Sequence, residues 1–173
     1  MKITLNILKD AFLYWLQIAI FIWPAFLLGN GFFALIVYFI FNSSCAQITE
    51  IASSILILCV LLFVFAYKRA YKKIEFHGSR ILISMLLAAG LQLLYARLFR
   101  FAVYTGAGAY YLAHYLYDPT RSVAYYEVPA SLYIASILAV YPLYILSVML
   151  GEYLGKQKRL QERDELTKTI SSK

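Results

Sequence analysis

Residues 11–41 form an apolar segment that contains no charged side chain. As one straight helix this segment would be about 46 Å long, whereas the hydrocarbon core of a bilayer is about 30 Å thick. Pro24 removes a backbone donor, and the Gly29–Gly31 triplet weakens a helix further. We therefore expect a long first transmembrane helix that is kinked or broken at these positions. The alternative is two short half-spans hinged at Gly29–Gly31.

Three further apolar stretches follow, at residues 51–67, 81–99 and 131–153. The chain is 62% hydrophobic and 14% charged, whereas a soluble domain is about 45–50% apolar and about 25% charged. The sequence therefore predicts an all-α integral membrane protein, a bundle of about four transmembrane helices. Residues 1–155 would form this bundle, and residues 156–173 would form a charged cytoplasmic tail.

The basic side chains gather on one side of the predicted bundle. Of the 16 Lys and Arg residues, only Arg97, Arg100 and Arg121 fall on the other side. Loops rich in Lys and Arg stay in the cytoplasm, so the N-terminus, the 68–80 loop and the C-terminus are predicted to be cytoplasmic. The net charge of +7 then reflects topology and attraction to anionic lipid headgroups. We expect a lipid bilayer as the partner, and no nucleic acid.

The two cysteines do not indicate a disulfide, a metal site or a redox site. Cys45 falls in a predicted outer loop and Cys59 in the middle of a span, so a disulfide between them is not expected. The sequence contains no CxxC motif and no Cys/His cluster, which are the usual signals of zinc or redox sites. We expect no metal and no cofactor. The cysteine usage, with no import sequence, favours a bacterial plasma (inner) membrane.

The stretch between the third and fourth predicted spans is rich in tyrosine. An aromatic belt at headgroup level explains this enrichment, with residues 107–117 as a helix lying along the interface. The alternative is an aromatic lining that faces a cation or a lipid headgroup. Half of the chain's 16 tyrosines lie here: Tyr104, Tyr110, Tyr111, Tyr115, Tyr117, Tyr125, Tyr126 and Tyr133.

Arg97 and Arg100 lie three residues apart near the outer end of the third span. An arginine at this depth calls for a partner or a path to water. The acidic residues predicted on the same side are Glu50, Asp118 and Glu127. We expect a structural ion pair between one arginine and one of these carboxylates. An anion site formed by both arginines and simple snorkelling to the headgroups are the alternatives.

His114 and Asp118 are spaced to contact each other on one helical turn. A histidine–carboxylate couple can serve a general base or a metal, but one pair makes an incomplete site. The sequence also lacks the HExxH, GxSxG and Walker A patterns. We further expect no acidic residue inside a span that could perform acid–base chemistry. The chain is therefore predicted not to be an enzyme.

Polar side chains within the spans, Gln17, Asn30 and Gln92, are expected to join helices through hydrogen bonds. Gly151 and Gly155 form a GxxxG pattern at the membrane edge, which is weak evidence for dimerisation. These features favour a non-catalytic accessory or binding component of a membrane complex. The alternative is a small solute or lipid transporter, or a substrate-binding transport subunit. In either case the candidate ligand site is the outer group Arg97, Arg100, His114, Asp118, Glu127 and Glu50.

Overall fold

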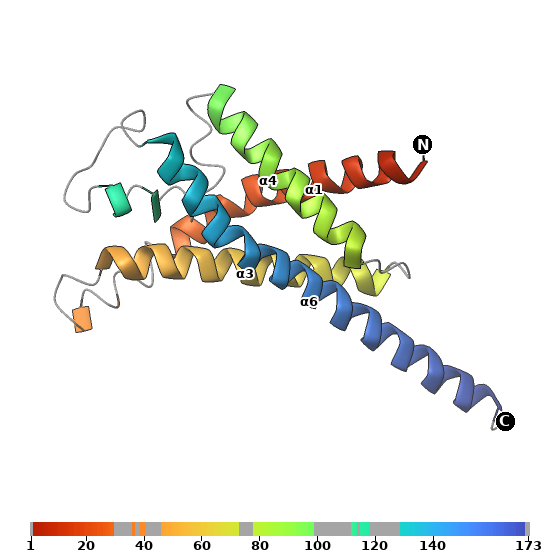
Figure 1. The fold of residues 1–173 in the computed structure, drawn as a ribbon. Coiled ribbons are helices and arrows are strands. Elements are labelled where there is room, and N and C mark those ends of the chain that lie inside the picture. The colour runs from red at the N-terminus through yellow and green to blue at the C-terminus, as the bar shows by residue number, and fades with distance from the viewer. Residues whose placement is uncertain are drawn as a thin grey trace.

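The computed structural model describes residues 2–29, 36, 39–40, 46–72, 78–98, 112–113, 115–117 and 129–171. Within these ranges almost every residue is helical and none lies in a strand. Four long helices hold most of them (Figure 1): α1 (Lys2–Leu28), α3 (Ala46–Lys72), α4 (Gly78–Leu98) and α6 (Ala130–Ser171). The predicted all-α fold is confirmed over this part of the chain.

Three of the helices are long and apolar enough to cross a membrane. The candidate spans are Leu5–Ala25 in α1, Ile51–Lys72 in α3 and Ile134–Lys168 in α6. Helix α4 has 21 residues and is apolar over Gly78–Leu94. These three candidate spans support the prediction of a membrane protein.

Helix α1 begins well before the first predicted span. It starts at Lys2 and includes the charged residue Asp10, which directly precedes the apolar segment at residues 11–41. Asp10 does not end the span because its side chain is buried against other helices. Pro24 lies inside α1, which continues to Leu28. The predicted break at Gly29–Gly31 falls largely outside the described residues, which end at Gly29 in this segment.

The four helices pack as a ring in which each contacts two neighbours extensively. Helix α1 packs against α3 and α4, and α6 packs against the same two helices. The most extensive contact joins α3 and α6, which run side by side in the same direction (Figure 1). Residues of all four helices therefore face one shared interior.

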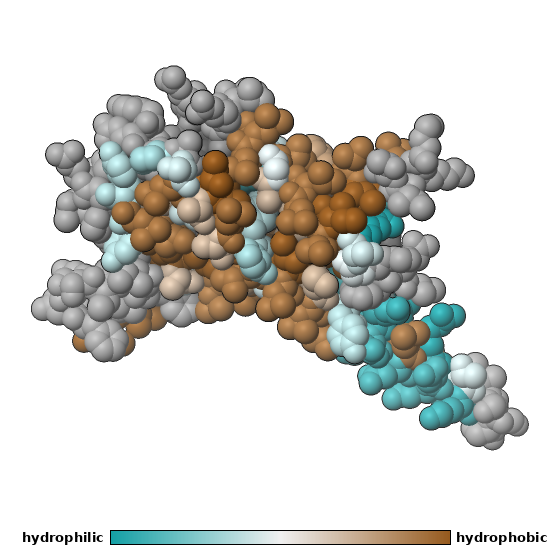
Figure 2. Space-filling view, in the orientation of Figure 1, coloured by the Kyte–Doolittle hydropathy of each residue, from teal (hydrophilic) through white to brown (hydrophobic). Residues whose placement is uncertain are grey.

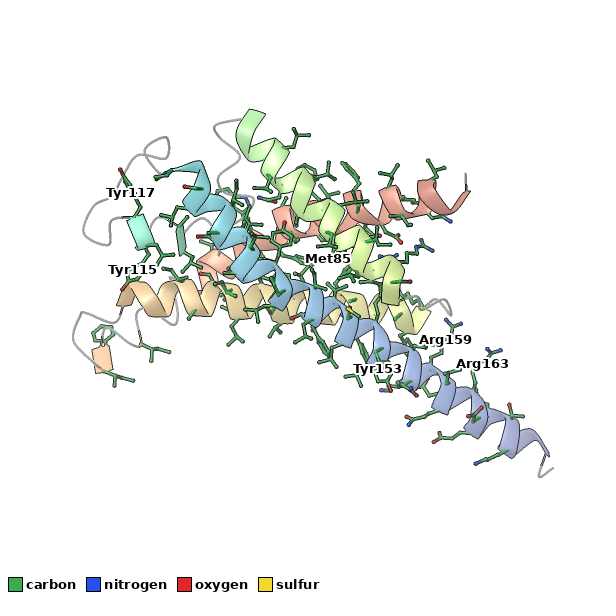
Figure 3. The ribbon with its side chains drawn as sticks, viewed as in Figure 1. Met85, Tyr115, Tyr117, Tyr153, Arg159 and Arg163 are labelled. Atoms are coloured by element: carbon green, nitrogen blue, oxygen red, sulfur yellow. The ribbon has the colours of Figure 1, made fainter. Side chains whose placement is uncertain are left out.

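The interior of the ring is formed by buried side chains that range from alanine to tyrosine, among them the fully buried Met85 labelled in Figure 3. Tyr14 and Ile18 of α1 pack there with Leu58 of α3 and Val148 of α6. Large apolar side chains also cover the outside of the helices, and Figure 2 shows this apolar surface over the bundle. Soluble proteins do not expose continuous apolar surface of this kind. The outward faces therefore fit contact with lipid.

A short helical piece lies between α4 and α6. Residues 112–113 and 115–117 are helical, and Ala113 is fully buried. Leu112 packs against the core, whereas Tyr117, labelled in Figure 3, is half exposed. These residues belong to the helix predicted at 107–117. Its position along the membrane surface stays a prediction.

Candidate functional site

The most polar region of the described structure is a cluster at the end of the bundle where α1 begins and α3 ends. Asp10 of α1 accepts a hydrogen bond of 2.7 Å from Nη2 of Arg69 of α3. Its other oxygen accepts a bond of 2.8 Å from Nε of Arg80 of α4, whose Nη2 lies 2.6 Å away. One carboxylate therefore links three helices through two guanidinium groups.

Glu152 brings the fourth helix into the same cluster. The hydroxyl of Tyr14 donates a hydrogen bond of 2.6 Å to Oε1 of Glu152 on α6. Nη1 of Arg69 lies 4.0 Å from the same oxygen, an ion pair without a hydrogen bond. The Arg69 guanidinium also lies 5.3 Å from the centre of the Tyr14 ring, a favourable cation–π distance. We call Asp10, Tyr14, Arg69, Arg80 and Glu152 the charged cluster.

The charged cluster is shielded and electrically balanced. The Asp10 and Glu152 side chains are 11% and 8% exposed, and Arg69 and Arg80 are 19% and 29% exposed. Two carboxylates face two guanidinium groups, so the formal charge of the cluster is zero. Charges withdrawn from water are costly unless they are paired and hydrogen-bonded. Each charge in this cluster has an opposite charge beside it.

The local sequence explains how the helices bring these residues together. Asp10 and Tyr14 are four residues apart on α1 and therefore lie on one face. Arg69 stands between the buried Ala66 and Ala70 on α3. These small neighbours allow α3 to approach the other helices closely. Arg80 belongs to the first turn of α4, so its long side chain reaches back to Asp10.

Two glycines position Glu152 by allowing α6 to touch the backbone of α3. A Cβ atom added at Gly151 would lie 2.5 Å from the carbonyl oxygen of Phe63, and one at Gly155 would collide with the carbonyl oxygen of Tyr67. No real Cβ atom tolerates such a distance, so both positions need glycine. Both contacts lie within one chain. The GxxxG pattern thus serves the α3–α6 contact, which we call the glycine seam.

Further polar side chains lie inside the bundle beyond the charged cluster. Gln17 and Gln92 are both buried, in agreement with their predicted place within the spans. Ser84 of α4 donates a hydrogen bond of 3.3 Å to the carbonyl oxygen of Ile7 of α1. Ser53 of α3 donates one of 3.5 Å to the carbonyl oxygen of Gly29. Hydroxyl groups therefore join α1 to both of its neighbours.

The expectation that no acidic residue lies inside a span was wrong. Glu152 is 6% exposed and lies within the candidate span Ile134–Lys168, and Asp10 is 8% exposed within Leu5–Ala25. Both carboxylates are tolerated because Arg69, Arg80 and Tyr14 pair with them. The cluster has an acid and a hydroxyl in contact, but its two acids are engaged by other residues of the chain. Within the described residues no group of three metal-ligating side chains occurs.

The side chains of the outer residues predicted as a ligand site lie outside the part of the chain that the structure describes. Arg97 lies in α4 and Glu50 in α3, but their side chains fall outside what the structure describes. Arg100, His114, Asp118 and Glu127 lie outside the described residues altogether. The predicted outer site therefore stays a prediction.

Sequence reasoning missed the charged cluster for an identifiable reason. The 68–80 loop, which contains Arg69 and Arg80, was interpreted only as a signal of topology, and Asp10 was given no role. The available signal was Glu152, an acid at the end of the apolar run at 131–153. An acid in such a run requires a cationic partner, and arginines were available at the same predicted end of the bundle.

The comparisons with known proteins add no functional assignment. No family model matches the chain, and neither the curated proteins nor the solved structures yielded a match. The functional argument therefore rests on the residues of the chain itself.

Proposed function

We propose that the chain is a non-catalytic binding component of a membrane complex. In this proposal four helices cross the bilayer, and the charged cluster lies at the cytoplasmic end. The surface offered to the partner is the last part of α6, residues 156–171. We call this part the α6 extension.

The topology rests on helix lengths and on the basic residues. Helix α4 has 21 residues, which corresponds to about 30 Å and matches the hydrocarbon core. It joins the three longer apolar helices as a fourth crossing. Basic residues lie close to the charged cluster along the same helices: Lys9 is next to Asp10, Lys68 and Lys72 are within one turn of Arg69, and Lys158 follows Glu152 on α6. The positive-inside rule then assigns the end with the charged cluster to the cytoplasm.

The observation that carries the proposal is the length of α6. This helix has 42 residues, about 63 Å, which is roughly twice the hydrocarbon thickness. Its last part runs on beyond the other three helices, and its surface is hydrophilic (Figures 1 and 2). A lone helix of about 16 residues is marginally stable in water. A continuous helix held at its base is a suitable platform for a binding partner.

The base of the α6 extension is held by contacts with α3 and with the charged cluster. Gly151 and Gly155 pack on the α3 backbone, and Glu152 accepts the hydrogen bond of Tyr14. About two turns beyond Gly155, the hydroxyl of Tyr71 donates a hydrogen bond of 2.5 Å to Glu162. These contacts set the direction in which the extension leaves the bundle. A partner would therefore meet a preorganised helix, which reduces the entropic cost of binding.

The charged residues favour binding over catalysis. In the charged cluster the acidic groups are occupied by arginines and by a tyrosine hydroxyl of the same chain. A general acid or base must be within hydrogen-bond reach of a substrate. The paired cluster is better suited to joining four helices than to proton transfer with a substrate.

A small transporter is the second candidate, and one observation favours it. Ionisable residues inside membrane helices often mark a path for ions or solutes. Glu152, Asp10 and the buried Gln92 give the bundle a partly polar interior. A transporter would use these groups directly and would not require the α6 extension.

The test compares proteins that copurify with three forms of the full chain in mild detergent. Gln161 is exposed in the middle of the extension, so Gln161→Pro should break the helix there, whereas Gln161→Ala keeps it. We expect a stoichiometric partner with the wild type and with Gln161→Ala, and its loss with Gln161→Pro. Equal recovery with the proline variant, or no partner with the wild type, would overturn the proposal.

A further inference from the structure

One face of the α6 extension carries a group of basic side chains. Arg159 and Arg163 are four residues apart and point to the same side of α6, as Figure 3 shows. Lys156 lies three residues before Arg159 and belongs to the same face. Like charges at this spacing repel each other. The face would therefore be stabilised by an anion.

The acidic residues of the extension are poorly placed to supply that anion. Neither the third nor the fourth residue on either side of Arg163 is acidic. For Arg159 the only acidic residue at such a spacing is Glu162, which already accepts the hydrogen bond of Tyr71. Nη1 of Arg159 is shielded from solvent and has no hydrogen-bond partner among the described residues.

The depth of Arg159 matches the headgroup layer of a membrane, and Arg163 lies one turn, about 6 Å, farther out, so its long side chain would have to reach back toward the same layer. Arg159 lies one turn beyond Gly155, where α6 still packs on the end of α3. The headgroup layer on each side of a bilayer is about 5–8 Å thick, and the rise from Gly155 to Arg159 is about 6 Å. Tyr153, labelled in Figure 3, is half exposed just before this point. An exposed tyrosine is typical of the membrane–water boundary.

We propose that Arg159 and Arg163 together bind the phosphate of an anionic phospholipid on their side of the membrane. The planar guanidinium group can donate two parallel hydrogen bonds to a phosphate, so two arginines on one face can hold it from two sides. The site goes beyond the proposed protein partner and does not depend on it. It requires only that α6 crosses the membrane.

The test measures lipid binding to the purified, delipidated full chain by native mass spectrometry. Phosphatidylglycerol and phosphatidylcholine are titrated in parallel. The site variant is Arg159→Gln with Arg163→Gln. The matched control is Lys158→Gln with Lys168→Gln, which removes the same charge from other faces of the same helix. All four substitutions lie beyond the glycine seam and outside the charged cluster, so the bundle should fold in each variant.

The wild type should bind phosphatidylglycerol more tightly than phosphatidylcholine. Because the site variant loses the charge-assisted hydrogen bonds of both guanidinium groups, we expect it to lose at least roughly tenfold in affinity for phosphatidylglycerol. The control should stay close to the wild type. An equal loss in both variants would overturn the site, because it would indicate unspecific attraction by net charge. Competition by glycerol phosphate or by an acidic peptide at the same concentration as the lipid would also overturn it.

Discussion

The glycine seam and the charged cluster hold the same end of the bundle together by different physical means. At the seam, α3 and α6 approach until only glycine fits between the backbones at Gly151 and Gly155. In the cluster, side chains from all four helices are joined by charge, with Asp10 at the centre. The seam depends on shape and tolerates no added volume. The cluster depends on complementary charges, and removing one charge would leave its partner buried and unpaired.

The same difference is seen in how neighbouring helices are held together. Helices α3 and α6 need no side chain between them and form the closest contact in the ring. The α1–α4 contact is bridged at the charged end by the Asp10–Arg80 pair and by the hydrogen bond from Ser84 to the Ile7 carbonyl. In lipid the hydrophobic effect does not drive helices together, so close packing and polar contacts must do so. The chain uses close packing where α3 meets α6, and polar contacts where α1 meets α3 and α4.

The largest expected effect comes from closing the glycine seam with a single methyl group. In Gly151→Ala the new Cβ would lie 2.5 Å from the Phe63 carbonyl oxygen, so α6 must move away from α3. Overpacking of this kind costs about 1–3 kcal/mol. We expect a lower midpoint of thermal unfolding in detergent.

Gly90 provides the matched control for this substitution. A Cβ at Gly90 meets no atom within 4 Å among the described residues. Alanine is a better helix former than glycine by up to about 1 kcal/mol, so Gly90→Ala should raise the midpoint or leave it unchanged. A Gly151→Ala protein as stable as the wild type would show that the seam is not tight.

A smaller effect is expected when the cluster loses one hydroxyl. Tyr14→Phe removes the donor to Glu152 and leaves the ring beside Arg69. Hydrogen bonds between membrane helices contribute about 0.6 kcal/mol on average, and those to charged groups more. We expect a loss of about 1 kcal/mol, measured by unfolding in detergent.

Tyr71→Phe is the control for Tyr14→Phe. It removes a tyrosine–glutamate hydrogen bond between α3 and the α6 extension that is exposed to solvent. This change should leave the unfolding midpoint within experimental error. If both substitutions lower the unfolding midpoint equally, the buried hydrogen bond of Tyr14 contributes no more to stability than the exposed one of Tyr71, which would contradict the prediction.

The sequence predicted the helical membrane fold because a long apolar segment in a bilayer must satisfy its backbone hydrogen bonds internally, as a helix does. It placed Gln17 and Gln92 inside the spans, and the structure buries both. It did not predict the charged cluster, because pairing depends on which helices are neighbours. Arg69 and Asp10 are far apart in the chain and meet only when α1 packs against α3. The GxxxG pattern was visible in the sequence, but the helix that it contacts was not.

Asp10 illustrates the same limit of sequence-based prediction. A charged residue near an apolar run usually lies in water, and this residue would do so if α1 were alone. Burial becomes favourable only when Arg69 and Arg80 are both present. The burial of Asp10 therefore depends on how the helices pack, and the residues next to it in the sequence do not predict it.

The central claim is that the charged cluster couples the helices, and a double-mutant cycle on Asp10 and Arg80 tests it most directly. The single variants Asp10→Asn and Arg80→Gln and the double variant are compared with the wild type by unfolding in detergent. Residues in one ion-pair network show interaction energies of about 0.5–3 kcal/mol. We therefore predict that the double variant loses clearly less stability than the two single losses added together. Losses that add to within about 0.5 kcal/mol would contradict the claim, because independent sites behave in that way.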